Sequence, residues 1–245
     1  MLNDGVYSFA ETLTEGLRYG TGYKPIELNV YNVDATINVN IYEGHNIVEG
    51  GLIRYATLSK FASNDILGNS LDVNGKSVFS VVDGVSSVFI SGNNNYIGYS
   101  TPLTLNSFTL SVWMKAVGTA LVTFSNGYYG SDSGEMWIML NSDTLSIANG
   151  SQYGGTIAEL PADSGWHHCA VSWSGDKFIL YLDGTKVESD PCSYYFEDAY
   201  LYAGSLQRAF DHVGGDGYYA ALRMYDRVLE DNEIYQLANE FKPTI

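Results

Sequence analysis

Two histidines and a cysteine stand side by side in the stretch "GWHHCAVSWSGDKFILYLDGTKV", which begins at Gly165. Histidine and cysteine are zinc ligands and partners in thiol catalysis, so the cluster suggests a reactive site. The stretch alternates like a β-strand, however, and neighbouring residues of a strand point to opposite faces of the sheet. His167 and His168 should therefore diverge, with Cys169 on the face of His167. We predict ordinary strand residues here, and neither a metal site nor a nucleophile.

The composition sets limits on the function. The chain has 245 residues, which is long enough to bury a large core. Its formal net charge is -16, so it would repel a phosphate backbone. Nucleic acid is excluded as a partner on this ground. No apolar segment is long enough to span a bilayer, and residues 1–17 lack the basic start and apolar core of a secretory signal. Two cysteines, Cys169 and Cys192, do not make a disulfide framework, and we expect two free thiols.

Strand patterns dominate the chain. Apolar and polar residues alternate over 26–30 and again over 37–41, with Asp34 between them as a turn or bulge. Further short strands, spaced about ten residues apart and separated by Gly, Asn and Asp, are typical of a sandwich or jelly roll. The turn-rich stretch 63–75 is the expected boundary. We predict an N-terminal β attachment or oligomerisation segment over 1–62 and the sandwich over 63–245.

The end of the chain has the pattern of a helix. Ile234, Leu237, Ala238 and Phe241 recur at steps of three and four residues. The acidic residues Glu230, Asp231 and Glu233 suit the positive end of the helix dipole. We therefore predict one short amphipathic helix after the last strand.

Three motifs follow one another along the second part of the chain. They are "SFTLSVWMKA", the "GWHHCAV…YLDGTKV" hairpin described above, and "LRMYDRVLEDNEIYQLANE". In this order they resemble laminin-G-like domains of the concanavalin A-like lectin/glucanase superfamily. The resemblance covers residues 66–242 and leaves about the first sixty unmatched. The residues that carry it are Phe108, Thr109, Leu110, Trp113 and Lys115, then Trp166, His167, His168, Tyr181, Asp183 and Gly184, then Arg223, Tyr225, Arg227, Leu229, Glu233, Ile234 and Leu237.

The resemblance implies an all-β fold. We expect an antiparallel two-sheet jelly-roll sandwich (concanavalin A-like) with a small N-terminal β extension and one short C-terminal helix. Cys169 stands where the family usually has valine, as a small buried hydrophobe. The expected core residues, or their strand neighbours, are Trp113, Trp166, Cys169, Val171, Phe178 and Leu180.

Enzymes that share this fold use paired carboxylates on one strand, spaced as Glu-x-Asp-x-x-Glu or Glu-x-Asp-x-Glu. The chain has neither spacing, and it has no nucleophile elbow and no HExxH pattern. We predict no catalytic residues, and we predict that the protein is not an enzyme.

Loops between the strands are rich in tyrosine, asparagine and aspartate. Aromatic rings pack on the apolar faces of sugars, and amides and carboxylates bind sugar hydroxyls. These loops are compatible with two interpretations. They form a carbohydrate site, or their tyrosines only pack against the edges of the sandwich itself. The predicted ligand-binding residues are Tyr128, Tyr129, Tyr153, Tyr194 and Tyr195.

Calcium is the one candidate cofactor, although none is required. The resemblance implies a structural calcium held in part by an acid just before the last strand, where this chain has Ala220 or Ala221. Asp211 and Asp216 in the preceding loop are the predicted substitutes, because calcium accepts mixed carboxylate and carbonyl oxygens.

Two functional hypotheses follow. The first is a non-enzymatic virion structural protein (a phage head decoration, fibre or tail component) that displays the sandwich on the virion surface for glycan or host-surface binding. In it, residues 1–60 bind a capsid or tail protein and form a homo-oligomer, because a few amphipathic strands bury too little core to be stable alone. The alternative is an extracellular bacterial lectin or a carbohydrate-binding accessory module of a glycanase. A decoration piece without any ligand remains a third alternative.

Overall fold

The computed structural model divides the chain into two compact units, Met1–Glu49 and Gly50–Ile245. We describe each unit by itself. Within them the structure describes residues 25–32, 35–42, 48–60, 62–92, 95–126, 135–149, 156–204 and 215–240.

The first unit contains a two-stranded antiparallel sheet. Its strands are β1 (Pro25–Asn32) and β2 (Ala35–Tyr42), and they pair from Pro25↔Tyr42 to Asn32↔Ala35. The two predicted strands are thus confirmed, while Asp34 between them lies outside the described residues.

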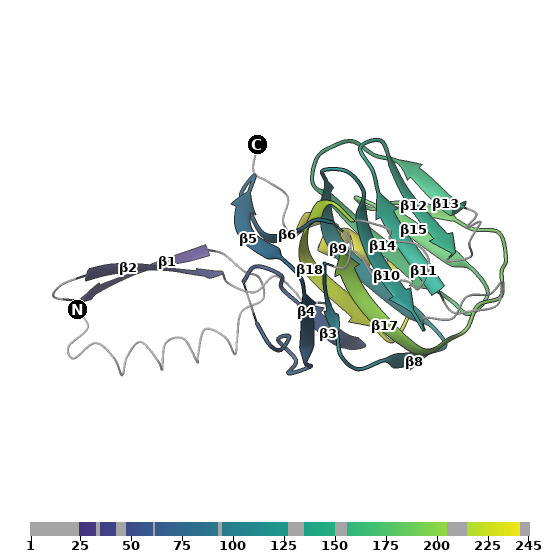
Figure 1. Ribbon diagram of the computed structural model, residues 1–245, viewed down its shortest axis with the longest axis horizontal. Coiled ribbons are helices and arrows are strands. Elements are labelled where there is room, and N and C mark those ends of the chain that lie inside the picture. Colours follow the sequence, from purple (N-terminus) through teal and green to yellow (C-terminus); the bar gives the residue numbers. More distant parts are fainter. Residues whose placement is uncertain are drawn as a thin grey trace. The chain divides into compact units, whose positions relative to one another are not determined.

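The second unit is a sandwich of two antiparallel sheets (Figure 1). Sheet I has the order β13-β12-β11-β10-β17-β7-β4, with β8 also paired to β17, and sheet II has the order β16-β15-β14-β9-β18-β6-β5, with β3 also paired to β18. The strands of sheet I are β4 (Leu71–Asn74), β7 (Tyr96–Tyr99), β8 (Leu103–Leu105), β10 (Ala120–Ser125), β11 (Glu135–Leu140), β12 (Thr144–Asn149), β13 (Thr156–Pro161) and β17 (Phe196–Gly204). Those of sheet II are β3 (Leu52–Ala56), β5 (Ser77–Val82), β6 (Val85–Ile90), β9 (Phe108–Ala116), β14 (His167–Trp173), β15 (Phe178–Leu182), β16 (Thr185–Glu188) and β18 (Gly217–Tyr225).

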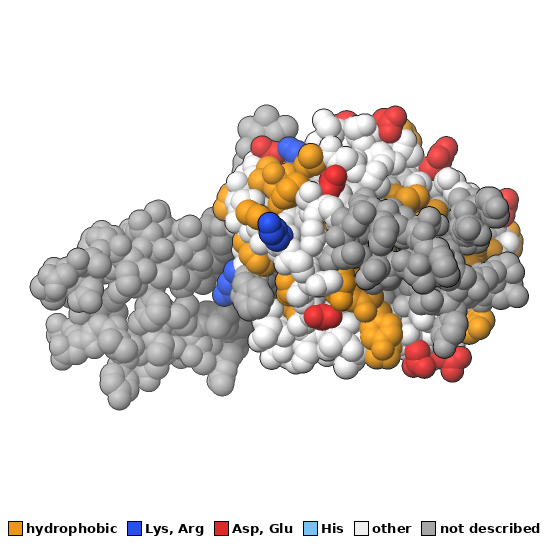
Figure 2. Space-filling view, viewed as in Figure 1, with side chains coloured by type: hydrophobic (Ala, Val, Ile, Leu, Met, Phe, Trp, Pro, Cys, Tyr) orange, Lys and Arg blue, Asp and Glu red, His pale blue; other side chains and the backbone are white. Residues whose placement is uncertain are grey.

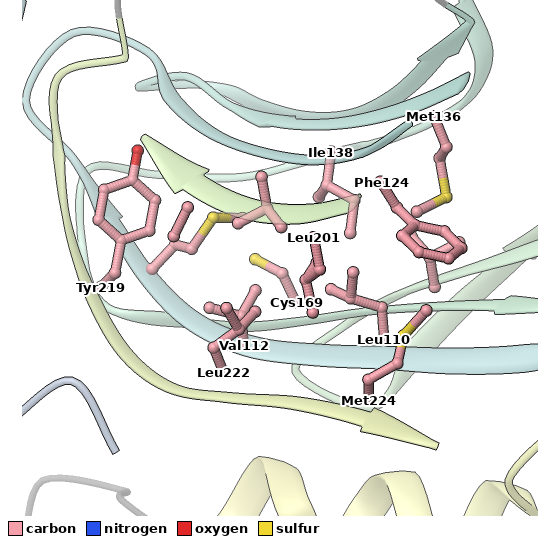
Figure 3. Close-up of a cluster of buried hydrophobic side chains, with 14 of the residues drawn as sticks. Leu110, Val112, Phe124, Met136, Ile138, Cys169, Leu201, Tyr219, Leu222 and Met224 are labelled. Carbon is pink, nitrogen blue, oxygen red and sulfur yellow. The ribbon is translucent and has the colours of Figure 1, made fainter. Parts of the chain in front are cut away.

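The core lies between the sheets and follows the alternation of the strands. On β9 and β14, Leu110 pairs with Val171 and Val112 with Cys169, and all four side chains are buried in the core. Phe124, Ile138 and Leu201 face them from sheet I (Figure 3). Cys169 thus occupies an aliphatic position, and both cysteines are free thiols, as predicted. The predicted jelly-roll sandwich is confirmed.

The predicted helix is confirmed as α2 (Asp231–Asn239). Its start is a capping box in which the Glu233 carboxylate accepts the Glu230 N–H at 2.8 Å. Ile234, Leu237 and Ala238 are its buried residues. The helix packs against β14. No helix in the described part of the chain is long and apolar enough to cross a membrane.

Two of the predicted core residues lie elsewhere. Trp113 is buried outside the core cluster, and its Nε1 donates to the Leu237 carbonyl of α2 at 3.4 Å. Trp166 is half-buried, and its Nε1 donates to the Val82 carbonyl at 3.1 Å. The reason is alternation, since Leu110, Val112 and Met114 of β9 face the core and Trp113 must therefore face away. Cys169, Val171, Phe178 and Leu180 lie in the core as predicted.

The boundary between the two units also differs from the prediction. The second unit begins at Gly50 and not at residue 63, because β3 belongs to the sandwich and pairs with β18. The turn-rich stretch 63–75, where the boundary was expected, instead contains a loop held by hydrogen bonds to Asp65. The Asp65 carboxylate is buried and accepts the N–H groups of Tyr55 and Asn69 at 2.9 and 2.8 Å and the hydroxyl of Tyr99 at 3.1 Å.

Candidate functional site

The His–His–Cys cluster diverges as predicted. His167 lies 2.7 Å from a carboxylate oxygen of Asp183 through its Nδ1, whereas Nε2 of the fully buried His168 lies 2.8 Å from the Ser111 hydroxyl on the other face. Cys169 is fully buried in the core. Among the described residues, no group of three or more His, Cys, Asp or Glu side chains could hold a metal ion. The cluster therefore stabilises sheet II.

The two histidines have opposite effects on stability as the pH changes. Burial, with Arg223 nearby, lowers the pKa of His168 to about 3, while the hydrogen bond to Asp183 raises the pKa of His167 above its ordinary 6.5. Below pH 6.5 the unfolded chain protonates His168 and the folded chain does not, so acid destabilises the fold through this residue. His167 contributes stability below pH 6.5 that is lost as the pH rises through its folded pKa.

We expect His168→Leu to remove the acid destabilisation that His168 causes. Between pH 7.5 and pH 5 the free energy of unfolding of the unmodified chain should fall by about 2 kcal/mol relative to that of the variant, because only the unmodified chain has a neutral buried histidine. Urea denaturation at both pH values measures the difference. A difference between the two proteins that does not change with pH would contradict the prediction.

The structure describes three of the seven residues predicted from sequence to bind a ligand or metal. Tyr128, Tyr129, Tyr153 and Asp211 lie outside the described residues.

The two described tyrosines of this set have different surroundings. Tyr194 is half-buried, with its ring 6.0 Å from that of Trp173 and 5.5 Å from that of Phe178, so it packs on the edge of the core. Tyr195 is exposed by 56% and is free to meet a ligand.

Asp216 connects several loops at one end of the sandwich. Its carboxylate accepts the Gly92 N–H at 2.9 Å, and its carbonyl accepts those of Val117 and Gly118 at 3.0 and 3.1 Å. The carboxylate bond to Gly92 gives the aspartate side chain a structural role without an ion. Calcium binding by Asp211 and Asp216 stays a prediction.

Three tyrosines form a platform on the outer face of sheet I. Tyr96 comes from β7, and Tyr200 and Tyr202 come from β17, where they alternate with core residues. The ring of Tyr202 lies 4.9 Å from that of Tyr96, edge to face, and 6.1 Å from that of Tyr200, nearly parallel to it. All three side chains are half-buried, so part of each ring meets solvent. We call these residues the tyrosine platform.

Gly98 allows the platform to form. It lies opposite Tyr202 in the β17–β7 pairing, and a Cβ at this position would meet Cδ1 of the Tyr202 ring at 2.1 Å. The ring therefore occupies the space above the glycine backbone. Any larger residue on β7 at this point would push Tyr202 away from Tyr96.

Strand register extends the platform across the sheet. Asp72, Gly98, Tyr202, Thr123 and Trp137 lie in one row over β4, β7, β17, β10 and β11. Thr123 stands between two large aromatic side chains and is only 1% exposed. Its hydroxyl oxygen has no hydrogen-bond partner among the described residues.

The hydroxyls of Tyr96 and Tyr202 remain protonated over the physiological pH range. Burial, followed by the negative charge of Asp72, raises the pKa of Tyr96, whose hydroxyl donates to an Asp72 oxygen at 3.2 Å. Burial also raises the pKa of Tyr202 to about 12, with smaller contributions from Tyr96 and Tyr200. The face thus combines aromatic surface with neutral hydroxyl donors.

A comparison with protein families decides the family. The profile of the concanavalin A-like lectin/glucanases superfamily matches residues 91–235, which is more than half of the chain. The chain belongs to this superfamily. The match lies inside the range 66–242 that the sequence motifs indicated. A search of curated protein sequences found no match.

Solved structures of the same fold include carbohydrate-binding domains. Domain 4 of an extracellular arabinanase from Geobacillus stearothermophilus, in complex with arabinotriose, superimposes with a TM-score of 0.60 at 17% identity, covering 78% of this chain and 100% of that domain. The ligand-binding domain of botulinum neurotoxin serotype D, in complex with N-acetylneuraminic acid, gives 0.55 at 10% identity over 78% of this chain and 51% of its own. At these identities the likeness shows the superfamily fold alone.

Enzymes are also among the similar structures. Trypanosoma rangeli sialidase in complex with sialic acid gives a TM-score of 0.61 at 14% identity, covering 94% of this chain but only 38% of the enzyme. The present protein thus spans about half the length of the toxin domain and a smaller part of the sialidase.

Sequence reasoning missed the tyrosine platform. It considered tyrosines in loops, whereas Tyr200 and Tyr202 stand at alternate positions of "AYLYAG" and Tyr96 in "YIGY". The available signal was the combination of tyrosines on one face with small or aliphatic residues on the other. Because β7 and β17 lie about a hundred residues apart, only the pairing of these strands brings the rings together.

Proposed function

We propose that the sandwich of residues 50–245 binds carbohydrate on the tyrosine platform without cleaving it. The observation that carries this proposal is the contact between Tyr96, Tyr202 and Tyr200 above Gly98 on an outer sheet face. Aromatic rings offer apolar surface to the C–H faces of sugars, and phenol hydroxyls at the ring edges bind sugar hydroxyls.

The arabinanase and toxin domains, which share the fold and were solved with bound sugars, favour the same class of ligand.

The acids on the platform row support binding without hydrolysis. Glycoside hydrolysis generally uses two carboxyl groups that flank the scissile bond. Of the five described residues in the row, only Asp72 is acidic, and it already accepts the Tyr96 hydroxyl. The two glutamates at the start of the helix, Glu230 and Glu233, are engaged in its capping box.

A glycan array probed with the full chain and with Tyr202→Ala tests this proposal. We expect the full chain to bind a defined group of glycans and the variant to lose them. If the full chain binds no glycan on the array and none in polysaccharide-containing gels, the proposal is wrong.

A finer proposal concerns display on a virion surface through the first unit. Its support is the division of the chain after Glu49 and the two-stranded sheet β1–β2, since two strands alone are marginally stable and leave edges that invite pairing. In this proposal residues 1–49 pack against further copies of the chain and against a capsid or tail protein. The alternative, an extracellular lectin or accessory module of a glycanase, needs only the platform.

Two truncations test the attachment proposal. Removing residues 1–49 should leave a folded monomer, while the full chain sediments as an oligomer. Removing residues 1–60 also deletes β3, which pairs with β18, and should lower the melting temperature clearly below that of the shorter truncation. A full chain that sediments as a monomer and binds no particle component would rule out attachment through this unit.

A further inference from the structure

The charges of the sandwich are divided unequally between its two sheets. The eight described strands of sheet I contain no lysine, arginine or histidine and five acidic residues, namely Asp72, Glu135, Glu159, Glu197 and Asp198. The strands of sheet II contain six basic residues, Arg54, Lys115, His167, His168, Lys186 and Arg223, and a single acid, Glu188. Figure 2 shows red carboxylate side chains scattered around the described surface of the sandwich.

The segments next to these strands add few positive charges. The turn after β4 contains one lysine, Lys76. Residues 127–134, 150–155 and 205–214 follow β10, β12 and β17 in the sequence, and together they contain one arginine, one histidine and two aspartates. With the histidine neutral, their sum is one positive and two negative charges. The whole chain carries a formal net charge of -16, so its general field is also negative.

This charge distribution bears on the kind of glycan that the tyrosine platform accepts. Carboxylates and sulfates are recognised by arginine and lysine, with arginine favoured for its two parallel hydrogen bonds. The described strands of sheet I have neither residue. Among the described residues, the Tyr96 hydroxyl donates to the Asp72 carboxylate, which lies at the end of the platform row. One lysine, Lys76, lies in the turn after β4, where its N–H donates to Asn95.

We propose that the tyrosine platform selects neutral oligosaccharide chains and rejects acidic glycans such as sialylated or uronic-acid sugars. This inference rests on the proposed carbohydrate binding and adds the class of sugar. It separates the protein from the toxin domain of the same fold that was solved with N-acetylneuraminic acid. Phenol hydroxyls and aromatic faces make the contacts, and the acids of sheet I repel a negative ligand.

The platform row also fits a chain better than a single sugar. It crosses five strands from Asp72 to Trp137, and four spacings between neighbouring strands amount to about 19 Å. Tyr202 stands in the middle of this length, and Trp137 stands at the end opposite Asp72. A ligand of several sugar units is long enough to contact both Tyr202 and Trp137.

Matched pairs of neutral and acidic probes test the inference on the full chain. Galactan is compared with polygalacturonan by affinity gel electrophoresis, and lactose with sialyllactose by calorimetry, each at 50 mM and 500 mM NaCl. The neutral member should bind with the same strength at both salt concentrations. The acidic member should bind at least about tenfold more weakly at 50 mM, and salt should reduce this difference by screening the repulsion. For longer neutral chains we expect tighter binding than for lactose.

Asn74→Lys provides the matched variant. Asn74 is exposed on β4 and pairs in register with Tyr96, so a lysine there adds a positive charge directly beside the Tyr96 ring. It should improve binding of the acidic member by about fivefold at 50 mM NaCl and leave the neutral member unchanged.

The outcomes separate the two proposals. If the acidic member of a pair binds as well as the neutral member or better, the selection is wrong while carbohydrate binding stands. If Asn74→Lys leaves the acidic member unaffected, charge does not govern the choice and the inference fails. If neither member of any pair binds, and no other neutral glycan does, the proposed function itself is wrong.

Discussion

Tyr202→Ala is expected to abolish detectable carbohydrate binding and to leave the fold intact. Tyr202 is the central ring of the tyrosine platform and contacts both Tyr96 and Tyr200. Loss of a central aromatic contact typically costs at least about 2 kcal/mol of binding free energy, or roughly 30-fold in affinity. Binding is measured by calorimetry or affinity electrophoresis with the glycan that the full chain prefers.

The effect on stability should be small, because the Tyr202 side chain lies on the outer face of sheet I and outside the core. Tyr235→Ala is the matched control for a general effect of losing a surface tyrosine, since Tyr235 is 61% exposed on α2. It should bind like the unmodified chain.

Tyr195→Ala tests the prediction that came from the loops. If this variant loses affinity and Tyr202→Ala keeps it, the ligand site lies at the loop tyrosines and the platform is only a structural feature. If both variants lose affinity, the site extends along β17 from its start. Equal losses in Tyr202→Ala and Tyr235→Ala would contradict a specific role of the platform.

Arg223→Ala is expected to give the largest loss of stability among single substitutions of charged residues. Arg223 on β18 is fully buried, and its Nη2 donates to the Tyr55 hydroxyl at 2.8 Å and to a Glu240 oxygen at 2.7 Å. Its guanidinium also lies over the Tyr55 ring, 4.2 Å from the centroid. It thus connects β18, β3 and the end of α2.

Removing one partner of a buried ion pair commonly costs 3–5 kcal/mol, and we expect a loss of about this size in the free energy of unfolding. The Glu240 carboxylate, whose side chain is only 11% exposed, would lose its cation. Arg223→Met should cost less, because methionine keeps apolar contacts along the stem. Urea denaturation of each variant gives the values.

Lys177→Ala is the control for the ion pair itself. The Lys177–Glu188 pair has the same 2.6 Å separation as the Arg223–Glu240 pair, but both of its side chains are more than a third exposed. Surface pairs contribute little, so the melting temperature should stay unchanged within error. A loss in Lys177→Ala as large as that in Arg223→Ala would show that burial is not the reason.

The sequence by itself determined the fold class, the superfamily and the final helix. Apolar residues alternate on β1 and β2, and three motifs follow one another from Phe108 to Leu237. Both patterns depend on neighbours along the chain, which a sequence displays directly. The behaviour of the His167–Cys169 cluster was predictable for the same reason, because the alternation of a strand is a local property.

Only the tertiary structure decided which strands are neighbours. The boundary of the sandwich and the position of the candidate site follow from that pairing. β3 belongs to the second unit because it pairs with β18, more than 160 residues away, and no local pattern shows this partner. Alternation turns Trp113 away from the core, and the tertiary structure buries it there beside α2, whose Leu237 carbonyl accepts its Nε1–H. Tyr96 and Tyr202 form a platform because strand register places Gly98 beneath a ring, and register is set by packing of the whole sheet.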